Sequence, residues 1–163
     1  MTRLLNRLEA MTEWTGKLVS YLVWIGAVML SWEVVARYFF SAPTVWAHGY
    51  SQRIFGSYFV LVGGYTLLRG GHVRVDLLTS RLSLRVQKFF DLVNYGFLLL
   101  WSGVLIGEGW LFFFDSWKIR EVDEMVLAHP VYPYKFLLVI GGLMIFVQGI
   151  GCTIRTLGTM KKE

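Results

Sequence analysis

Four charged residues stand inside long apolar stretches of this sequence. They are Glu33, Arg37, Arg53 and Glu108. A charge at the centre of a membrane-spanning helix costs about 2.5–3.5 kcal/mol on insertion scales, so each of these residues needs a compensating role. Intramembrane carboxylates can relay protons or ions, and carboxylates paired with guanidinium groups can hold helices together. The residue types therefore leave two interpretations open, an ion relay and a structural ion-pair layer.

The apolar stretches are long enough to cross a lipid bilayer. The chain is 55% apolar and has a mean hydropathy of +0.52, which exceeds the usual range of soluble domains. Crossing the hydrocarbon core takes about 20 mostly apolar residues, and four windows satisfy this: 18–40, 46–68, 89–114 and 131–153. Short links join them. The sequence thus predicts a single all-α integral membrane domain over 1–163, with four transmembrane helices in an antiparallel up-down bundle.

The four charges fall at similar depths in these windows. Glu33, Arg53 and Glu108 each lie about 10 Å from the same end of the expected bundle at helical rise. Glu33 and Arg37 are also four residues apart, a spacing at which an ion pair forms locally on a helix. Because two acids and two bases compensate each other, we favour a structural ion-pair layer joining the first three windows.

The distribution of basic residues predicts the orientation. Eleven lysines and arginines lie at the end that the two termini would share, and five lie at the other end, so both termini are expected in the cytoplasm. Residues 1–17 have apolar positions at helical spacing and are expected to form a cytoplasmic interfacial helix. The net charge of +5 then favours anionic phospholipid over nucleic acid as a partner. Candidate lipid or partner contacts at this end are Arg69, His72, Arg74, Asp76, Arg81 and Arg85.

Two further features indicate partner surfaces. The link before the last window is charged and is a candidate docking site for a soluble periplasmic partner through Lys118, Arg120, Glu121, Asp123 and Glu124. Glycines recur at four- or seven-residue intervals in the last three windows, as in Gly103 and Gly107 or Gly142 and Gly149. Such spacing lets helices approach closely, either within this chain or against a partner.

Other chemistry is excluded or weakly indicated. His48, His72 and His129 sit at window ends or in links, which disfavours a haem held by two histidines. Cys152 is the single cysteine, so neither a zinc site nor an internal disulfide is expected. No catalytic motif is present, and we expect no enzyme activity and no bound metal or cofactor. A small proton-coupled exporter using Glu33 or Glu108 and a membrane anchor for a redox complex remain as alternatives.

Several motifs resemble those of one transporter family. The sequence Arg37-Tyr38-Phe39-Phe40 closes the first window, and Trp46 opens the second. Gly71-His72-Val73-Arg74-Val75-Asp76 follows the second window, and Pro130-Val131-Tyr132-Pro133-Tyr134 precedes the last. Together they resemble the small membrane subunit of tripartite ATP-independent periplasmic (TRAP) transporters over nearly the whole chain. One position departs from the family pattern, because Gly49 stands where an acidic residue is usual.

The resemblance implies a specific role. In that family a larger membrane subunit carries the substrate and sodium sites and moves as an elevator, while a soluble periplasmic protein delivers the substrate. The small subunit enlarges the stationary scaffold. We therefore expect an accessory subunit for sodium-coupled import of a small organic acid anion across the bacterial inner membrane, with Na+ bound in the large partner rather than in this chain.

Overall fold

The computed structural model describes residues 2–71, 82–124 and 128–160. This part of the chain forms four α-helices and contains no β-strand beyond one isolated bridge. The helices are α1 (Thr2–Phe39), α2 (Ala47–Leu68), α4 (Leu84–Ile119) and α5 (Tyr132–Met160). The all-helical architecture predicted from the sequence is confirmed for the described residues.

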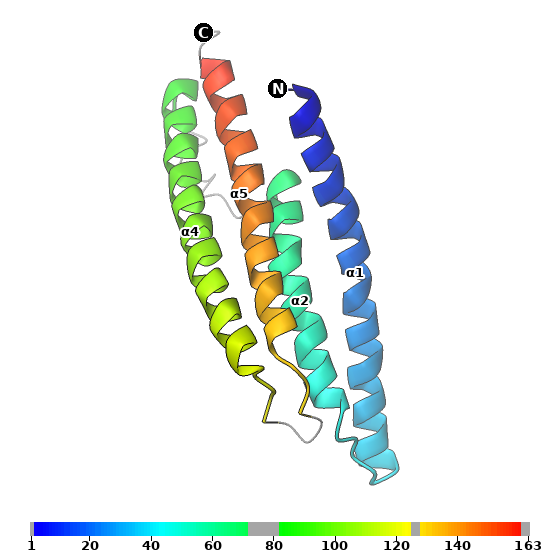
Figure 1. Ribbon diagram of the computed structural model, residues 1–163. Helices are drawn as coiled ribbons and strands as arrows, with labels where there is room; N and C mark the ends of the chain where they lie inside the picture. Colours follow the sequence, from blue (N-terminus) through cyan, green and yellow to red (C-terminus); the bar gives the residue numbers. More distant parts are fainter. Residues whose placement is uncertain (1, 72–81, 125–127, 161–163) are drawn as a thin grey trace.

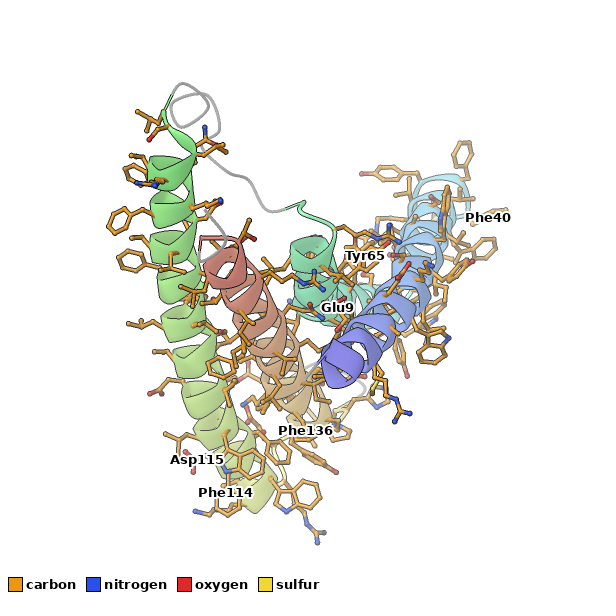
Figure 2. The ribbon with its side chains drawn as sticks, turned by 90° about the horizontal axis from the view of Figure 1, so that it is seen from above. Glu9, Phe40, Tyr65, Phe114, Asp115 and Phe136 are labelled. Carbon is orange, nitrogen blue, oxygen red and sulfur yellow. The ribbon has the colours of Figure 1, made fainter. Side chains whose placement is uncertain are left out.

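Helix α5 lies at the centre of the arrangement. It packs along both α4 and α2, and α1 packs along α2. Viewed from above, α1 and α4 are the flanking helices, with α2 and α5 between them (Figure 2). The chain reverses direction after each helix, so that both termini lie at one end, here called the terminal end (Figure 1). The α1–α2 and α4–α5 connections lie at the opposite end, here called the connection end.

Three helices have the length and composition of membrane spans. They comprise Arg7–Phe39, Leu84–Ile119 and Tyr132–Thr159. Helix α2 is not among them, because His48, Gln52 and Arg53 occupy its first turns and lower its hydropathy. Of these three side chains, Arg53 is largely shielded by its pair with Asp123, whereas His48 and Gln52 are exposed. The predicted span 46–68 thus corresponds to a helix of suitable length, while its crossing of the membrane stays a prediction.

The first helix differs from expectation. The sequence pattern predicts an interfacial helix over 1–17 and a separate span over 18–40, but the structure has one continuous helix from Thr2 to Phe39. No proline interrupts this stretch, and its Gly16 packs directly against the ring of Tyr65 on α2, where a Cβ atom would come within 2.3 Å of Tyr65 Cγ. At about 1.5 Å per residue the helix is some 57 Å long, well beyond the roughly 30 Å hydrocarbon core.

A seam of mostly small residues joins α4 to α5. The buried residues of α4 recur every seven positions, and they are Tyr95, Ser102, Gly109 and Ser116. On α5, Gly142 faces Ile106 and Gly149 faces Leu98 and Leu99. A seven-residue interval returns to nearly the same helix face, so these residues keep two long helices close over several turns. The expectation that Gly142 and Gly149 mark a packing face is confirmed.

Glycines also bring α2 and α5 together. A Cβ atom at Gly141 would lie 2.6 Å from the carbonyl oxygen of Val60, and one at Gly64 would lie 2.9 Å from Met144 Cβ. By contrast, a Cβ atom at Gly56, Gly96, Gly103 or Gly107 would meet no described atom within 4 Å. The glycines of this chain therefore divide into those used for internal packing and those that face outward.

One buried polar contact crosses from α5 to α1. The Gln148 side-chain amide donates a hydrogen bond of 2.9 Å to the Thr12 hydroxyl, which itself donates to the carbonyl oxygen of Leu8. Both residues are buried. An unpaired amide here would lose its solvation without compensation, so this hydrogen bond fixes the register of the two helices.

Substituting Gly141 tests the close contact between α2 and α5. We expect Gly141→Leu to destabilise the protein by at least about 1–3 kcal/mol, because the added side chain would press on the backbone of Val60, which cannot rotate away. The measurement is thermal unfolding of the purified protein in detergent. Gly103→Leu is the matched control, since the space beside Gly103 is open. Equal melting temperatures for the two variants would contradict this packing.

Candidate functional site

Glu33 and Arg37 form the ion pair that their spacing predicted. The Arg37 guanidinium donates hydrogen bonds to one Glu33 carboxylate oxygen over 2.6 Å and 3.2 Å. The other oxygen accepts hydrogen bonds from the backbone N–H, at 3.1 Å, and from the hydroxyl of Thr44 in the α1–α2 connection. Glu33 is buried and fully engaged, so its carboxylate secures the turn between α1 and α2 instead of standing free for a relay.

Arg53 finds its partner in the segment between α4 and α5. Its guanidinium forms an ion pair with Asp123, and the two side chains are only 13% and 17% exposed. The guanidinium carbon also lies 5.3 Å from the ring centre of Tyr134 and 5.9 Å from that of Tyr50. Such distances allow cation–π attraction. This cluster of an arginine, a carboxylate and two tyrosines lies at the connection end.

The structure does not unite the four charges in one layer. Glu108 is exposed on α4 and contacts neither Arg53 nor Arg37 among the interactions of the described residues. Two residues at equal depth are neighbours only if their helices pack together. Because α5 packs between α4 and α2, Glu108 on α4 does not reach Arg53 on α2. The expected layer is replaced by a local Glu33–Arg37 pair and a separate Arg53–Asp123 pair.

The α4–α5 connection is folded back onto α2. Helix α4 ends where Arg120 takes a left-handed backbone conformation (φ 50°). A bridge then pairs Val122 with Pro130, and the Asp123 N–H donates to the His129 carbonyl oxygen over 3.0 Å. His129 Nε2 lies 2.8 Å from the Tyr50 hydroxyl on α2. The connection is thus held to α2 at two places, by His129 and by Asp123.

The predicted docking residues of this connection have different roles. Glu121 pairs with Lys135, whose ammonium lowers the pKa of the Glu121 carboxyl. Asp123 is engaged with Arg53, so neither acid is a free surface group. Three of the predicted residues are exposed at the connection end, namely Lys118, Arg120 and Glu124. These three are the members of the set that can meet a soluble partner directly.

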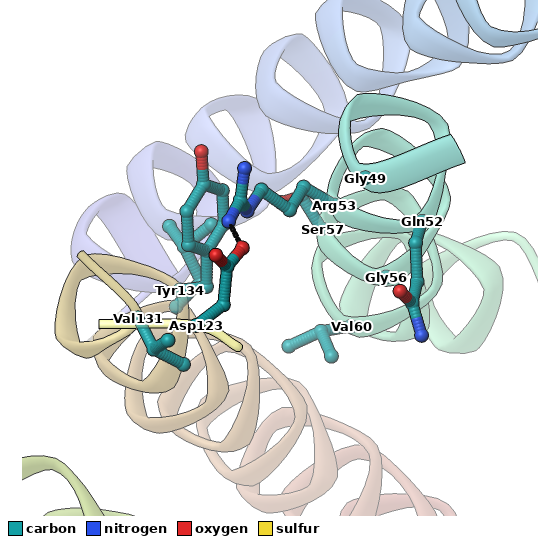
Figure 3. A pocket seen from close by; sticks show the side chains of 10 residues that line it. Gly49, Gln52, Arg53, Gly56, Ser57, Val60, Asp123, Val131 and Tyr134 are labelled. Carbon is teal, nitrogen blue, oxygen red and sulfur yellow. Dashed lines mark hydrogen bonds and ion pairs between the residues drawn. The ribbon is translucent and has the colours of Figure 1, made fainter. Parts of the chain in front are cut away.

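A pocket of about 370 Å³ opens beside the Arg53–Asp123 pair (Figure 3). Gly49 and Gly56 leave room on the α2 side, and Gln52 and Ser57 offer neutral hydrogen-bonding groups. The two charged lining residues, Arg53 and Asp123, neutralise each other. The pocket therefore presents no uncompensated charge with which to hold an ionic substrate. Gly49, which departs from the family pattern, lines this pocket, and no feature of the sequence indicates the pocket.

The candidates at the terminal end are only partly described. Arg69 donates to Glu13 over 2.5 Å and lies over the ring of Tyr65, while Arg85 is exposed at the start of α4. Arg155 and Glu9 form a further ion pair between α5 and α1. Four predicted contacts lie outside the described residues: His72, Arg74, Asp76 and Arg81.

The side chains that could bind a metal ion or a haem are not gathered at one place in the described part of the chain. It contains no group of three or more histidine, cysteine or carboxylate side chains placed to hold a metal ion. His129 is engaged with Tyr50, and His48 is exposed near the same end. Cys152 lies partly buried on α5 and forms no disulfide bond with a described residue. Several of the polar groups described above are engaged in ion pairs and hydrogen bonds that join helices and connections.

A double-variant comparison tests the partner of Arg53. Removing one member of a fully buried pair typically costs about 3–5 kcal/mol, because the other charge is left uncompensated. Because the Arg53–Asp123 pair is partly exposed, we expect Arg53→Leu to lower the stability by about 3 kcal/mol or less. Adding Asp123→Leu should restore part of the stability, whereas adding Glu108→Leu should not. The readout is the melting temperature in detergent, and rescue by Glu108→Leu alone would overturn the assignment.

The comparison with known protein families identifies the chain. Residues 26–159 match the family model described as tripartite ATP-independent periplasmic transporters, DctQ component. No individual curated protein matches the chain significantly. The matched region begins within α1 and includes α2, the α4–α5 connection and nearly all of α5. Because the match covers well over half of the sequence, the protein belongs to the DctQ family, the small membrane component of TRAP transporters.

Proposed function

We propose that this chain is a stationary scaffold subunit that contributes no substrate ligand. In this proposal it pairs in the bacterial inner membrane with a large elevator-type subunit, and a periplasmic binding protein docks transiently on the assembly. Transport is the sodium-coupled import of a small organic acid anion, with the Na+ sites in the large subunit. Membership of the DctQ family is the observation that carries the proposal.

The geometry of the described residues supports a role without a substrate site. Secondary transporters commonly bind substrate where helices are broken near the membrane midplane. Here each of the four helices is continuous over its whole length. The polar pocket lies near the connection end instead, and its arginine is already paired with Asp123. An anionic substrate would have to displace a carboxylate held by the chain itself.

The alternative functions have less support. A proton-coupled exporter would need an intramembrane acid facing a pathway, but Glu33 is engaged with Arg37 and Thr44 and Glu108 faces outward. A redox anchor would need cofactor ligands inside the helix assembly. Both histidines in the described residues lie at the connection end, and His129 is engaged there.

The proposed orientation places the terminal end in the cytoplasm. Cysteines introduced at Gly158 and Glu124 in a Cys152→Ser background should react differently with a membrane-impermeant thiol reagent in intact cells. We expect labelling at position 124 only, because the excess of basic residues keeps the terminal end inside. Permeabilised cells provide the control in which both cysteines react. Labelling at position 158 alone in intact cells would reverse the orientation.

Deletion of the subunit tests the scaffold role. We expect loss of uptake when the chain is absent, together with retention of substrate or sodium binding by the large subunit if that subunit remains stable. Binding is measured by calorimetry on the purified large subunit, and uptake is measured in cells. Specific, saturable substrate binding by the purified small subunit would refute the proposal.

A further inference from the structure

The far side of α4 is a helix face that packs against no other described helix. The buried positions of α4 all lie on the seam with α5, and the opposite side is turned away from the other helices (Figure 2). Leu100 and Leu111 on this side are 64% and 57% exposed. Apolar exposure alone would suit lipid. The same face, however, carries a charge that lipid cannot satisfy.

Glu108 is that charge. It lies six residues before Phe114, about 9 Å inside the apolar part of α4 at helical rise. No hydrogen bond or ion pair involves it within the described part of the chain. A glutamate side chain is too short to reach the headgroup region from this depth as lysine and arginine do. Intramembrane acids usually face the interior of an assembly and pair with a base.

The other acid within an apolar helix shows the contrast. Glu33 is buried and accepts hydrogen bonds from Arg37 and Thr44 of the same chain. A carboxylate at the depth of Glu108 needs equivalent compensation, and the neighbouring turns of α4 offer only apolar side chains such as Leu105, Leu111 and Phe112. The missing base must therefore come from another molecule.

The outer face of α4 has room for a second helix, and that helix can carry the base. Gly96, Gly103 and Gly107 lie along one line of α4 at intervals of seven and four residues, and the space beside each is open. Glycines inside this chain are used for close helix contacts, as at Gly141 and Gly149. A partner helix can approach α4 equally closely, which brings its side chains within reach of Glu108.

We propose that the outer face of α4 binds a transmembrane helix of the large subunit that carries a lysine or arginine at the depth of Glu108. The face consists of Gly96, Leu100, Gly103, Gly107, Glu108 and Leu111. This inference rests on the proposed function, because it takes the large subunit as the partner. The charge of Glu108 selects a basic partner helix over lipid, and the open glycines set how near that helix lies.

Photo-crosslinking in native membranes tests which face meets the large subunit. A benzophenone amino acid at Leu100 or Leu111 should give adducts with the large subunit. The same probe at Trp24, which is 73% exposed on α1, serves as the matched control and should not. Adducts from Trp24 but not from α4, or adducts from α4 only to a second copy of this chain or to lipid, would overturn the assignment.

Recovery of the large subunit with a tagged small subunit tests the two features of the face. Glu108→Gln and Gly103→Leu should each lower recovery by about tenfold, an effect of the size expected from one lost intramembrane contact. Asp115→Asn is the control, because Asp115 lies seven residues further along the same face, at the end of α4 where water can solvate it. Unchanged recovery with both test variants would refute the interface.

Two outcomes separate this inference from the proposed function. If the unmodified chain never co-purifies with the large subunit and no position crosslinks to it, the scaffold proposal itself fails. If the large subunit co-purifies but crosslinks through another helix, only the assignment of α4 fails. Protease resistance of Gly103→Leu in membranes should equal that of the unmodified chain, which distinguishes lost association from misfolding.

Discussion

The close approach of α5 to α2 and α4 is the constraint on which the rest of the structure depends. In lipid there is no hydrophobic force that drives apolar helices together, so association relies on tight packing and a few polar contacts. Gly141 brings the α5 backbone against Val60, and Gly142 and Gly149 bring it against α4. With α5 held on both sides, α4 becomes a flanking helix, and the α4–α5 connection must pass close to the start of α2.

That path explains how the polar cluster at the connection end forms. The connection carries Asp123 and His129 to the first turns of α2, where Arg53 and Tyr50 lie. Glu121 and Lys135 pair at its two ends and help to fold it back. The pairings of Asp123 and His129 with α2 are not local in the sequence, and they depend on α5 beginning beside α2.

The sequence predicted what depends on local spacing. Helix type, the approximate bounds of four apolar segments, the Glu33–Arg37 pair and the packing role of Gly142 and Gly149 follow from periodicities of a single helix. The partner of Arg53 could not be found in this way. Depth along a helix follows from residue counts, but the identity of the lateral neighbour depends on the order of helices in space. Asp123 was noted as a charged loop residue, without any signal that it would reach Arg53.

Sequence composition alone does not predict the continuity of α1 or the polar start of α2. A change from amphipathic to apolar sequence near residue 17 suggested two elements, but the change in composition does not require a break in the backbone. Helix α2 has polar side chains in its first turns, and the most shielded of them, Arg53, pairs with Asp123 of the α4–α5 connection. The composition of a helix indicates whether lipid or water surrounds it. A polar side chain can, however, contact neighbouring protein in place of water.

The ion pairs at the two ends of the molecule differ in how far they are exposed to solvent. At the terminal end the pairs Glu13–Arg69 and Glu9–Arg155 include arginines that are more than half exposed, and exposed ion pairs contribute at most about 1 kcal/mol. At the connection end the Arg53–Asp123 pair is largely shielded and is flanked by two tyrosine rings. Solvent therefore screens the Arg53–Asp123 pair less than it screens either pair at the terminal end.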